Sequence, residues 1–447
     1  MHDENLSDRL AKAVATYLKG RPFSTVSATL LIAEDDGTWQ KASHGGRELW
    51  YPACVVKLAC RPAVAALIRE RGGEGAFSPE LWKDMESTYG PSENPPFGRV
   101  LDELTETSNY QPLPGESALF EQWRGNRLVF ERYLDSLGLL RGQRFVMKTY
   151  PGNTSEAPEG AEGLLMGWYG GNRLRTDDLA DLMLALVESR IEPESRELIH
   201  RLLKRERWAD ASVIGHGLPP GSRYYGKLGC GYDTEGDTAY VVLPNGRRFV
   251  LSLFADSRVE PYVEDGHFAE QAIIGPLVDA IITEFKLYTE PARAEVAVGD
   301  SNWTATGEWD ETATASLRTA WRIADGSGAR QEFRLTIEQA GTYELSYAYG
   351  HGTAGTSTAK MLLRGPSGNA PETILVDDYL DLSRVGDRWF RHGEFELVPG
   401  DHVLRIVDYI GDPRGRSIGM AAVRLRWIDV PTAPEPPNAG SIPSGNP

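Results

Sequence analysis

The hydrophobic pattern divides the chain into two parts. Up to about residue 290 it predicts both helices and strands, and beyond about residue 300 it predicts strands alone. Leu6–Leu18 repeats its apolar residues every four positions, which predicts a surface helix with one buried stripe. Phe23–Ala33 is rich in Thr, Val, Ile and Leu and predicts a buried strand. Acidic residues and a glycine at 34–37 then turn the chain into a second strand near Trp39.

The next stretch, from about residue 59 to 203, is mostly helical in pattern. It opens with the apolar run Leu58–Ile68. Two segments interrupt it, Tyr89–Gly98 and Tyr150–Gly163, and both are too rich in proline and glycine for regular elements. These segments are therefore predicted to be loops.

Strand character returns after this helical stretch. Strands are predicted at Tyr224–Tyr232, Thr238–Leu243 and Arg248–Ala255, and the last two are joined by an Asn-Gly turn that accepts positive φ angles. A closing helix is predicted from about His267 to Leu287. This order predicts an α+β domain, in which terminal helices cover an antiparallel sheet and an all-α lobe lies beside it.

Beyond about residue 300, short alternating strands follow one another with glycine-rich turns and no helices. This spacing predicts an all-β, jelly-roll-like sandwich. The predicted strands are Phe333–Ile337, Thr342–Tyr349, Ala359–Leu363, Thr373–Val376, Trp389–Leu397, His402–Asp408 and Met420–Trp427. We place the first domain at 1–290, the sandwich at 291–430 and a disordered Pro/Gly/Ser-rich tail at 431–447.

Composition and charge narrow the classes of function. The chain has 447 residues and a formal net charge of −17, which argues against partners such as nucleic acid or an anionic membrane surface. Its apolar runs fall short of the roughly 18 residues needed to span a bilayer. The N-terminus opens acidic, without the basic and apolar regions of an export signal. We expect a cytoplasmic protein, or an extracellular one if a signal has been removed.

The three cysteines, Cys54, Cys60 and Cys230, are too few for a disulfide framework. Cys54 and Cys60 are too far apart on a helix to be bridged, while a Cys54–Cys230 bridge stays open. Cys54 lies three residues before Lys57, just before the apolar run, so the amine can reach the sulfur one helical turn away. A thiol near a helix N-terminus and beside a cation has a lowered pKa and acts as a nucleophile. The histidines are scattered, and we predict no metal, nucleotide or other cofactor.

Three short motifs follow one another in an order that resembles a known set. Class A β-lactamases and penicillin-binding proteins use Ser-x-x-Lys, Ser-Asp-Asn and Lys-Thr-Gly. Here Cys54-Val55-Val56-Lys57, Thr107-Ser108-Asn109 and Lys227-Leu228-Gly229 stand in that order. Each motif alone has a structural interpretation, as a buried thiol, a helix end or an edge-strand lysine. The order and the surrounding elements favour a β-lactamase-like domain with a cysteine nucleophile.

The resemblance implies roles for these residues. Cys54 would attack an acyl carbon, with Lys57 as the base or as the cation that holds the thiolate. The backbone N–H groups of Cys54 and Cys230 would form the oxyanion hole.

The other members of the set would handle the substrate. Thr107 would relay a proton to the leaving group, and Asn109 would bind the substrate amide. Lys227 would attract a carboxylate, although Leu228 lacks the hydroxyl of the family's threonine. The neighbours Ser108, Tyr110 and Gly229 would line the substrate site.

One feature of class A β-lactamases is missing. Those enzymes use a glutamate in the loop before the region that matches Asn172–Thr176 to activate the deacylating water. This loop offers Glu156, Glu159 and Glu162 without the Glu-x-x-Leu-Asn pattern. They are either solvated loop charges or one of them serves deacylation. Without such a base, an amine, a thiol or water activated by Lys57 would take the acyl group.

The sandwich resembles the modules of golvesin or xanthan-lyase type that are appended to polysaccharide-active and cell-surface enzymes. The stretches that resemble them are 340–345 and 397–404. Its aromatic residues could stack sugar rings or could fill the core. These residues are Trp303, Trp309, Tyr347, Tyr349, Trp389 and Trp427.

The sequence thus favours a hydrolase or acyltransferase that forms a thioester acyl-enzyme on Cys54. Its substrate would be a small or peptide-like acyl compound, and the reaction that of an amidase, peptidase, thioesterase or transacylase. One alternative is a β-lactam hydrolase. Another is a catalytically impaired relative that binds a peptide or a glycan, and in a third the sandwich carries the function by binding glycan.

Overall fold

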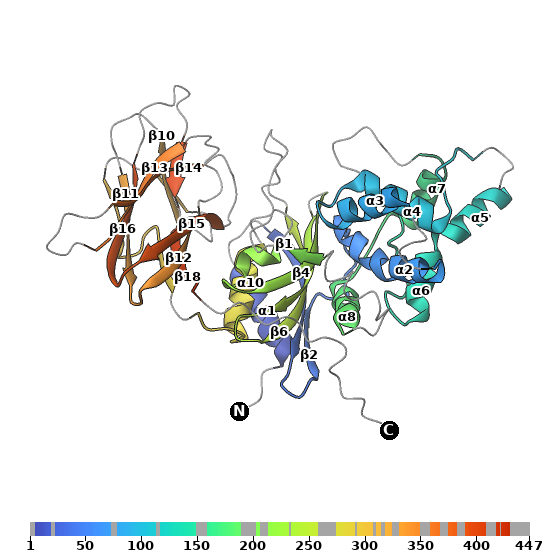
Figure 1. The fold of residues 1–447 in the computed structure, drawn as a ribbon, viewed down its shortest axis with the longest axis horizontal. Helices are drawn as coiled ribbons and strands as arrows, with labels where there is room; N and C mark the ends of the chain where they lie inside the picture. Colours follow the sequence, from blue (N-terminus) through green and yellow to red (C-terminus); the bar gives the residue numbers. More distant parts are fainter. Residues whose placement is uncertain are drawn as a thin grey trace.

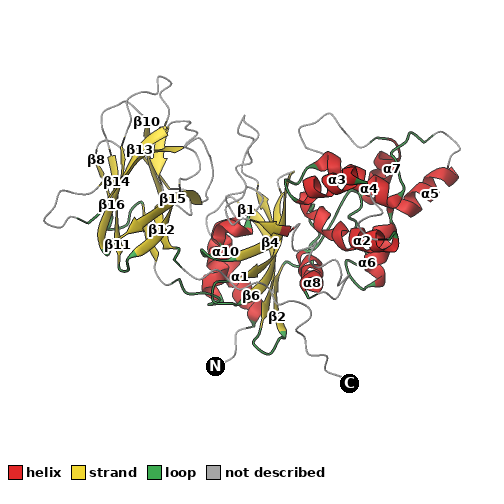
Figure 2. Cartoon of the chain, viewed as in Figure 1, coloured by secondary structure: helices red, strands yellow, loops and turns green. Residues whose placement is uncertain are grey.

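The computed structural model shows two folded parts joined near residue 290 (Figure 1). We describe residues 5–18, 23–72, 78–112, 117–148, 159–188, 203–205, 213–231, 234–257, 274–290, 293–306, 310–313, 318–323, 330–348, 358–366, 374–381, 389–407, 417–420 and 422–429. The first part combines helices with a sheet, and the second consists of strands (Figure 2). In the described residues, no helix is both long and apolar enough to cross a membrane.

A six-stranded antiparallel sheet organises the first part, with the order β2-β1-β6-β5-β4-β3. The N-terminal hairpin pairs with the strands that come after the helical lobe, because β1 lies beside β6. The strands are β1 (Phe23–Ala33), β2 (Trp39–His44), β3 (Lys204–Arg205), β4 (Arg223–Gly231), β5 (Thr234–Val242) and β6 (Arg248–Ser257).

Each face of this sheet carries its own hydrophobic core. The terminal helices α1 (Leu6–Leu18) and α10 (Ile274–Glu284) cover one face together with the short 3-10 helix η4 (Ile214–Gly217), around a core that includes Leu10, Leu251 and Ile281. The helical lobe covers the other face around a separate core. The alternation of side chains along each strand explains how one strand serves both cores.

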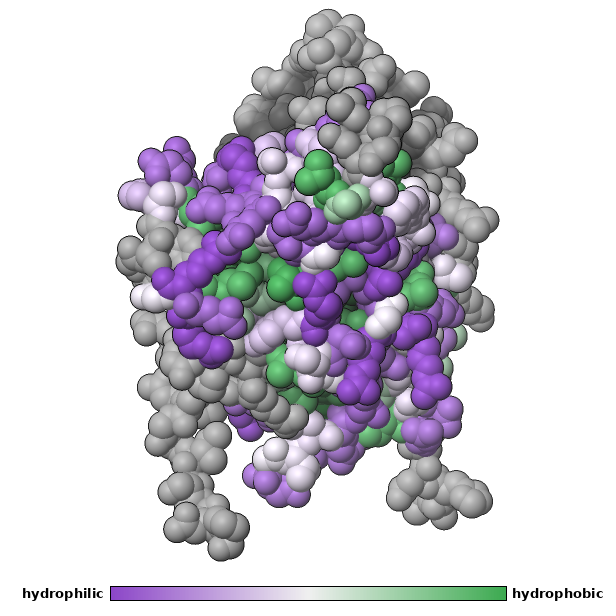
Figure 3. Space-filling view, turned by 90° about the vertical axis from the view of Figure 1, so that its right-hand side faces the viewer, coloured by the Kyte–Doolittle hydropathy of each residue, from purple (hydrophilic) through white to green (hydrophobic). Residues whose placement is uncertain are grey.

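The helical lobe is built around α2 (Val56–Glu70), most of whose residues are buried. The other helices are α3 (Pro79–Tyr89), α4 (Asn94–Thr105), α5 (Ser117–Arg127), α6 (Val129–Ser136), α7 (Gly160–Tyr169) and α8 (Thr176–Val187). Figure 3 shows the end of this lobe as a largely hydrophilic face with small hydrophobic areas. Among its exposed apolar side chains are Leu119, Leu164 and Trp168.

The second part packs a five-stranded sheet (β14-β13-β16-β11-β8) on a four-stranded sheet (β15-β12-β18-β7), and a three-stranded sheet (β17-β10-β9) accompanies them. The two larger sheets share one core that includes Phe333, Leu345, Met361 and Leu425. The strands are β7 (Arg293–Ala297), β8 (Trp303–Thr306), β9 (Asp310–Ala313), β10 (Arg318–Ile323), β11 (Arg330–Ile337), β12 (Gly341–Ala348), β13 (Thr358–Arg364), β14 (Ile374–Asp381), β15 (Trp389–Leu397), β16 (Gly400–Val407), β17 (Ser417–Met420) and β18 (Ala422–Trp427).

The predicted fold class, α+β followed by antiparallel β-sheet, is confirmed. The closing helix was predicted from about His267 to Leu287. Within the described residues, helix α10 covers Ile274–Glu284. Strands β7, β8, β9 and β10 were not predicted, because their runs are short and polar. The boundary near residue 290 stays a prediction, and the tail at 431–447 lies outside the described residues.

The sandwich aromatics that we weighed for sugar stacking divide into two groups. Tyr347 is buried, and Trp303 and Trp427 pack against the core shared by the two sheets. These three side chains therefore contribute to the core. Trp309, Tyr349 and the side chain of Trp389 lie outside the described residues.

Candidate active site

The local geometry around Cys54 follows from its place just before a helix. Cys54 lies in the single 3-10 turn η1 (Ala53–Val55), which runs directly into α2. Lys57, three residues later, is buried and places its Nζ 3.3 Å from the Cys54 Sγ. The positive end of α2 and the ammonium group therefore both act on a half-buried thiol.

A loop between α3 and α4 holds the Lys57 ammonium in place. Lys57 Nζ donates to the Ser92 carbonyl oxygen at 2.6 Å and to Asn94 Oδ1 at 2.9 Å. Asn94 Oδ1 is also 3.3 Å from the Cys54 Sγ. Since one amide oxygen touches both the amine and the sulfur, Asn94 fixes their separation.

Lys227 enters the same site from the sheet. Its buried Nζ donates to the Ser92 hydroxyl at 2.6 Å and to the Leu228 carbonyl oxygen at 2.9 Å. The Ser92 hydroxyl is also 3.4 Å from the Lys57 Nζ. The hydroxyl thus lies between two amines that come from different elements, α2 and β4.

Strand β4 passes so close to the turn that contains Cys54 that Gly229 has no room for a side chain. A Cβ at Gly229 would lie 2.6 Å from the Cys54 backbone N and 2.6 Å from the Pro52 carbonyl oxygen. Because backbone atoms cannot give way, a larger residue here would separate the strand from the turn. The next residue, Cys230, directs its side chain to the core under α1 and α10, as Leu228 also does.

Two residues of the site have strained backbones. Ala53, just before Cys54, has φ 41°, and Ser92 has φ 70°. Non-glycine residues seldom adopt this left-handed region, and such strain gathers at functional sites. Both residues hold atoms of the site in place through the backbone.

The three ionisable groups shift one another's pKa values. Burial alone would raise the pKa of the Cys54 thiol, but the charges of Lys57 and Lys227 and hydrogen bonds from Ser92 and Lys57 lower it. Burial lowers the pKa of Lys57, against the attraction of Cys54. Burial also lowers the pKa of Lys227, to about 7. The site therefore favours the thiolate form of Cys54 more than a free cysteine would, and it contains in Lys227 an amine that loses its proton readily near pH 7.

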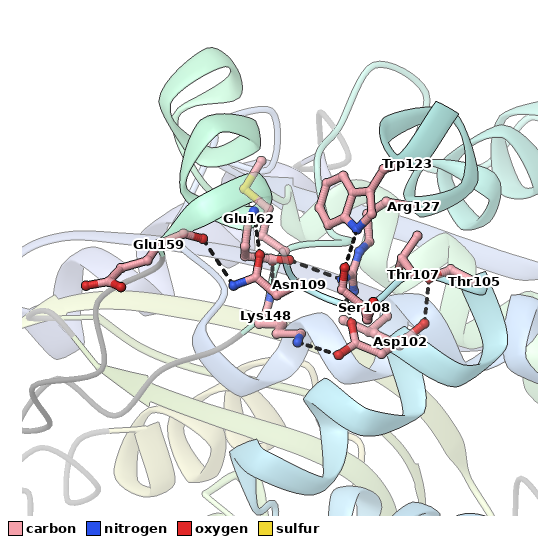
Figure 4. Close-up of polar contacts among 12 residues, drawn as sticks. Asp102, Thr105, Thr107, Ser108, Asn109, Trp123, Arg127, Lys148, Glu159 and Glu162 are labelled. Atoms are coloured by element: carbon pink, nitrogen blue, oxygen red, sulfur yellow. Dashed lines mark hydrogen bonds and ion pairs between the residues drawn. The ribbon is translucent and has the colours of Figure 1, made fainter. Parts of the chain in front are cut away.

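The structure does not bring Thr107 and Asn109 to this site, so the prediction for them is wrong in placement. The buried Thr107 hydroxyl lies 2.6 Å from the Thr105 hydroxyl (Figure 4). Asn109 bonds the backbone on both sides of the α7 start, through the Glu159 carbonyl and the Glu162 N–H.

The neighbouring residues Ser108 and Tyr110 also bond to helices of the lobe. The Ser108 carbonyl accepts from the Trp123 indole at 2.8 Å. The Tyr110 carbonyl accepts from the Ala161 N–H at 2.8 Å. This stretch therefore connects α4, α5 and α7 rather than lining the Cys54 site.

Ser92 and Asn94 belong to the candidate site by their contacts, and sequence reasoning missed them. They lie in the segment Tyr89–Gly98, which we predicted to be an irregular loop because of its prolines. In the structure α4 begins at Asn94, with proline in its first turn, where the missing N–H costs nothing. The signal was present in the sequence, since Ser92-Glu93-Asn94 is itself a Ser-x-Asn triplet before an apolar helix.

The three loop glutamates have different outcomes. Glu162 is buried, pairs with Arg127 at 3.2 Å and accepts from the Lys148 backbone N–H at 2.8 Å. It is therefore neither a solvated loop charge nor, by its contacts, a neighbour of Cys54. Glu159 is exposed at the start of α7, and Glu156 lies outside the described residues.

All three cysteines are free thiols, and Cys60 is buried with its pKa raised well above the usual range by burial. The described residues contain no group of three or more His, Cys, Asp or Glu side chains that could hold a metal ion. The groups that the described residues bring together at this site are the thiol, the two amines, the hydroxyl and the amide.

Comparison with known proteins gives one family match. Residues 124–284 match the beta-lactamase enzyme family. The matched segment contains Lys227 and Cys230 but begins after Cys54 and Ser92. It supports a β-lactamase-like first domain without identifying the nucleophile.

One curated relative spans both parts of the chain. The chain is 25% identical over 443 residues to golvesin of Dictyostelium discoideum, with 95% of this chain and 73% of golvesin aligned. The similarity therefore extends from the first domain through the sandwich.

Solved structures also resemble the chain. The beta-lactamase from Sphaerobacter thermophilus DSM 20745 is 19% identical, with 63% of this chain and 97% of that chain covered and a TM-score of 0.44. A point mutant of PBP-A, in its acyl-enzyme complex with penicillin G, is 16% identical, with 64% of this chain and 99% of that chain covered and a TM-score of 0.44.

Proposed function

We propose that the first domain is an acyl-transfer enzyme in which Cys54 forms a thioester with the substrate's acyl group. The observation that carries this proposal is the convergence of four groups around one sulfur. Lys57 Nζ and Asn94 Oδ1 are both 3.3 Å from Cys54 Sγ, and Ser92 links Lys57 to Lys227. A free buried thiol with only a packing role has no need of two buried lysines.

The reaction would proceed as follows. The Cys54 thiolate attacks the acyl carbon, so a C–S bond forms and the carbonyl oxygen becomes an oxyanion. The N–H groups of Cys54 and Cys230, on the turn and strand that meet at Gly229, would stabilise this charge. When the bond to the leaving group breaks, the Ser92 hydroxyl gives that group a proton and regains one from Lys227 or Lys57.

The next step decides between hydrolysis and transfer. In the described residues, Lys57 Nζ hydrogen-bonds to Cys54 and residues 92–94 and lies over the Phe97 ring; the charge of the Glu93 carboxylate raises the pKa of Lys57, but the hydrogen bond to Glu93 is made to its backbone carbonyl. Water would then have to be activated by an amine, and an amine or thiol acceptor would compete well with it. We therefore favour transfer or slow hydrolysis on a peptide-like or other small acyl substrate.

Substrate selection would differ from that of an enzyme with Lys-Thr-Gly. Lys227 offers a positive charge to a substrate carboxylate, but Leu228 directs its side chain into the opposite core and has no hydroxyl to donate. From Lys227 and Leu228 together, we expect a substrate whose binding depends less on a carboxylate than in an enzyme with Lys-Thr-Gly.

The test is detection of an acyl adduct on Cys54. The protein is incubated with an aryl thioester, an aryl ester and a β-lactam, and intact mass and peptide mapping locate any adduct. We expect an adduct on Cys54 that hydroxylamine removes, as it does for thioesters. Cys54→Ala should abolish it, whereas Cys60→Ala, the matched change at a free thiol outside the site, should leave it intact.

The outcomes separate the alternatives. An adduct that disappears only when an amine or thiol is added supports a transferase, and rapid turnover of the β-lactam in water supports a β-lactam hydrolase. A folded protein that forms no adduct at any pH, yet binds a peptide or a glycan equally well after Cys54→Ala, would overturn the proposal in favour of a binding protein.

A further inference from the structure

Strand β18 of the sandwich carries two arginines in a pattern that predicts exposure. Val423 and Leu425 face the sandwich core, so Arg424 and Arg426, on the alternate positions, should face water. Both arginines are instead fully buried, with 0% relative exposure. Because a buried arginine is stable only with polar partners, something must cover this face and provide them.

Three groups of the first domain are partners on this face, in addition to Glu295 and Glu344 of the sandwich's own strands. Arg426 donates to the Leu218 carbonyl oxygen at 3.1 Å and forms an ion pair with Glu290. Arg293 on β7 lies directly opposite Arg426 in the strand register and pairs with Asp279 of α10 at 3.1 Å. Figure 1 shows the sandwich on the α10 side of the central sheet, away from the helical lobe. The sandwich is thus docked on the back of the domain that carries Cys54.

The short helix η4 connects the docking contact at Leu218 to β4, the strand that carries Lys227. Leu218 directly follows η4, which packs so closely on α10 that a Cβ at Gly217 would lie 2.0 Å from the Gly275 carbonyl oxygen. At its other end, the Ile214 N–H donates to Asp237 Oδ2 at 2.9 Å. The same carboxylate oxygen accepts from the Tyr224 hydroxyl of β4 at 2.6 Å.

Asp237 therefore connects η4 to the strand that carries Lys227. It is buried on β5, in register with Leu228, the residue after Lys227. A displacement of η4 would move the acceptor that holds Tyr224, and with it the part of β4 that lies against the nucleophile turn. Packed cores transmit such shifts because they do not deform continuously.

We infer that the sandwich is a brace for the active site, in which Arg426 and Asp237 are positioning residues at the two ends of η4. The docked sandwich fixes η4, and η4 fixes the register and depth of β4 behind Lys227. The inference rests on the proposed function only in treating Cys54 and Lys227 as the reacting groups.

The experiment measures Cys54 itself in the full-length chain, so it does not depend on turnover. The rate of Cys54 alkylation by iodoacetamide is followed from pH 5 to 10 by peptide mapping. Arg426→Met removes the guanidinium, Arg426→Lys keeps the charge, and Glu290→Gln is a milder change if Arg426→Met fails to fold. Arg405→Met is the matched control, because Arg405 pairs with Glu332 on the other sandwich sheet.

We expect Arg426→Met to lower Cys54 alkylation at pH 7 about 3- to 10-fold and to move its midpoint upward, with partial recovery in Arg426→Lys and no change in Arg405→Met. Tyr224→Phe removes the hydroxyl that donates to Asp237 and keeps the Asp237 charge that acts on Lys227, so it should have a similar effect. The double variant should lose little more than either single one, as coupled positions do. A lowered melting temperature with an unchanged Cys54 profile, or fully additive losses, would overturn the inference. Normal alkylation without acyl adducts would instead refute the proposed function alone.

Discussion

Two stretches of the helical lobe carry the same kind of triplet, a hydroxyl residue followed two positions later by asparagine. Ser92-Glu93-Asn94 enters α4, and Thr107-Ser108-Asn109 leaves it. A helix of this length separates its ends by about 18 Å. The first triplet faces Lys57 and Cys54, whereas the second is held by α5 and α7.

The difference shows that a short motif does not determine its own position in the fold. Both triplets offer an alcohol and an amide, but only one lies where α2 and β4 converge. In the second, the hydroxyl and the amide are used to close a helix end, because Thr107 bonds Thr105 and Asn109 bonds the α7 backbone. Three predictions test this contrast, in order of expected size, and a fourth tests the protonation of Lys227.

Removing the two hydroxyls should have very different consequences for acyl transfer. Ser92→Ala should slow adduct formation on Cys54 by about 10²–10⁴-fold, the usual contribution of a positioned acid or base. Thr107→Val, which removes the corresponding hydroxyl and keeps the volume, should change the rate by less than about threefold. Stopped-flow acylation with one thioester measures both. Equal rates for the two variants would contradict the contrast.

Removing Glu162 should cost stability rather than chemistry. Glu162→Gln leaves the buried Arg127 with one carboxylate fewer, and breaking a buried pair costs about 3 kcal/mol in the free energy of unfolding. Urea unfolding measures this loss. The rate at which the Cys54 adduct disappears should stay the same at a temperature where the variant is folded. A slower deacylation would restore Glu162 as the missing base.

Replacing the two asparagines, Asn94 and Asn109, should likewise affect the acylation rate in one case and stability in the other. Asn94→Ala removes an acceptor of the Lys57 ammonium, and a hydrogen bond to a charged group contributes about 1.5–3 kcal/mol, or about 10- to 100-fold in acylation rate. Asn109→Ala should leave the rate unchanged and lower stability by about 1–2 kcal/mol, because two backbone partners lose their bond. If the rate instead fell with Asn109→Ala, the second triplet would belong to the site.

The last prediction concerns the pH dependence of stability. Burial lowers the pKa of Lys227 from 10.5 in the unfolded chain to about 7, so between these values the unfolded chain binds more protons. The free energy of unfolding should therefore rise with pH from about 7 to 10.5, and Lys227→Met should make that rise smaller. Chemical denaturation at several pH values measures it, with Thr107→Val as the unchanged control. An equal rise in Lys227→Met would place the effect elsewhere.

Much of the fold was readable from the sequence, because each element depends on residues close together in the chain. The four-residue repeat at Leu6–Leu18 and the β-branched run at Phe23–Ala33 gave the observed bounds of α1 and β1. The contact between Cys54 and Lys57 belongs to the same class, since a spacing of three on a helical turn fixes it. Sequence alone therefore determined the candidate nucleophile and its first cation.

Tertiary structure decided the rest of the site. Ser92 and Asn94 belong to it, and Thr107 and Asn109 do not, because packing selects which end of α4 meets α2. Lys227 arrives from a strand 170 residues after Lys57, and no local spacing places its amine on the Ser92 hydroxyl. The arginines of β18 follow an exposed pattern yet are buried, and Arg426 finds a carbonyl and a carboxylate partner in the docked domain. Local geometry is set by the backbone, but convergence is set by which distant surfaces pack together.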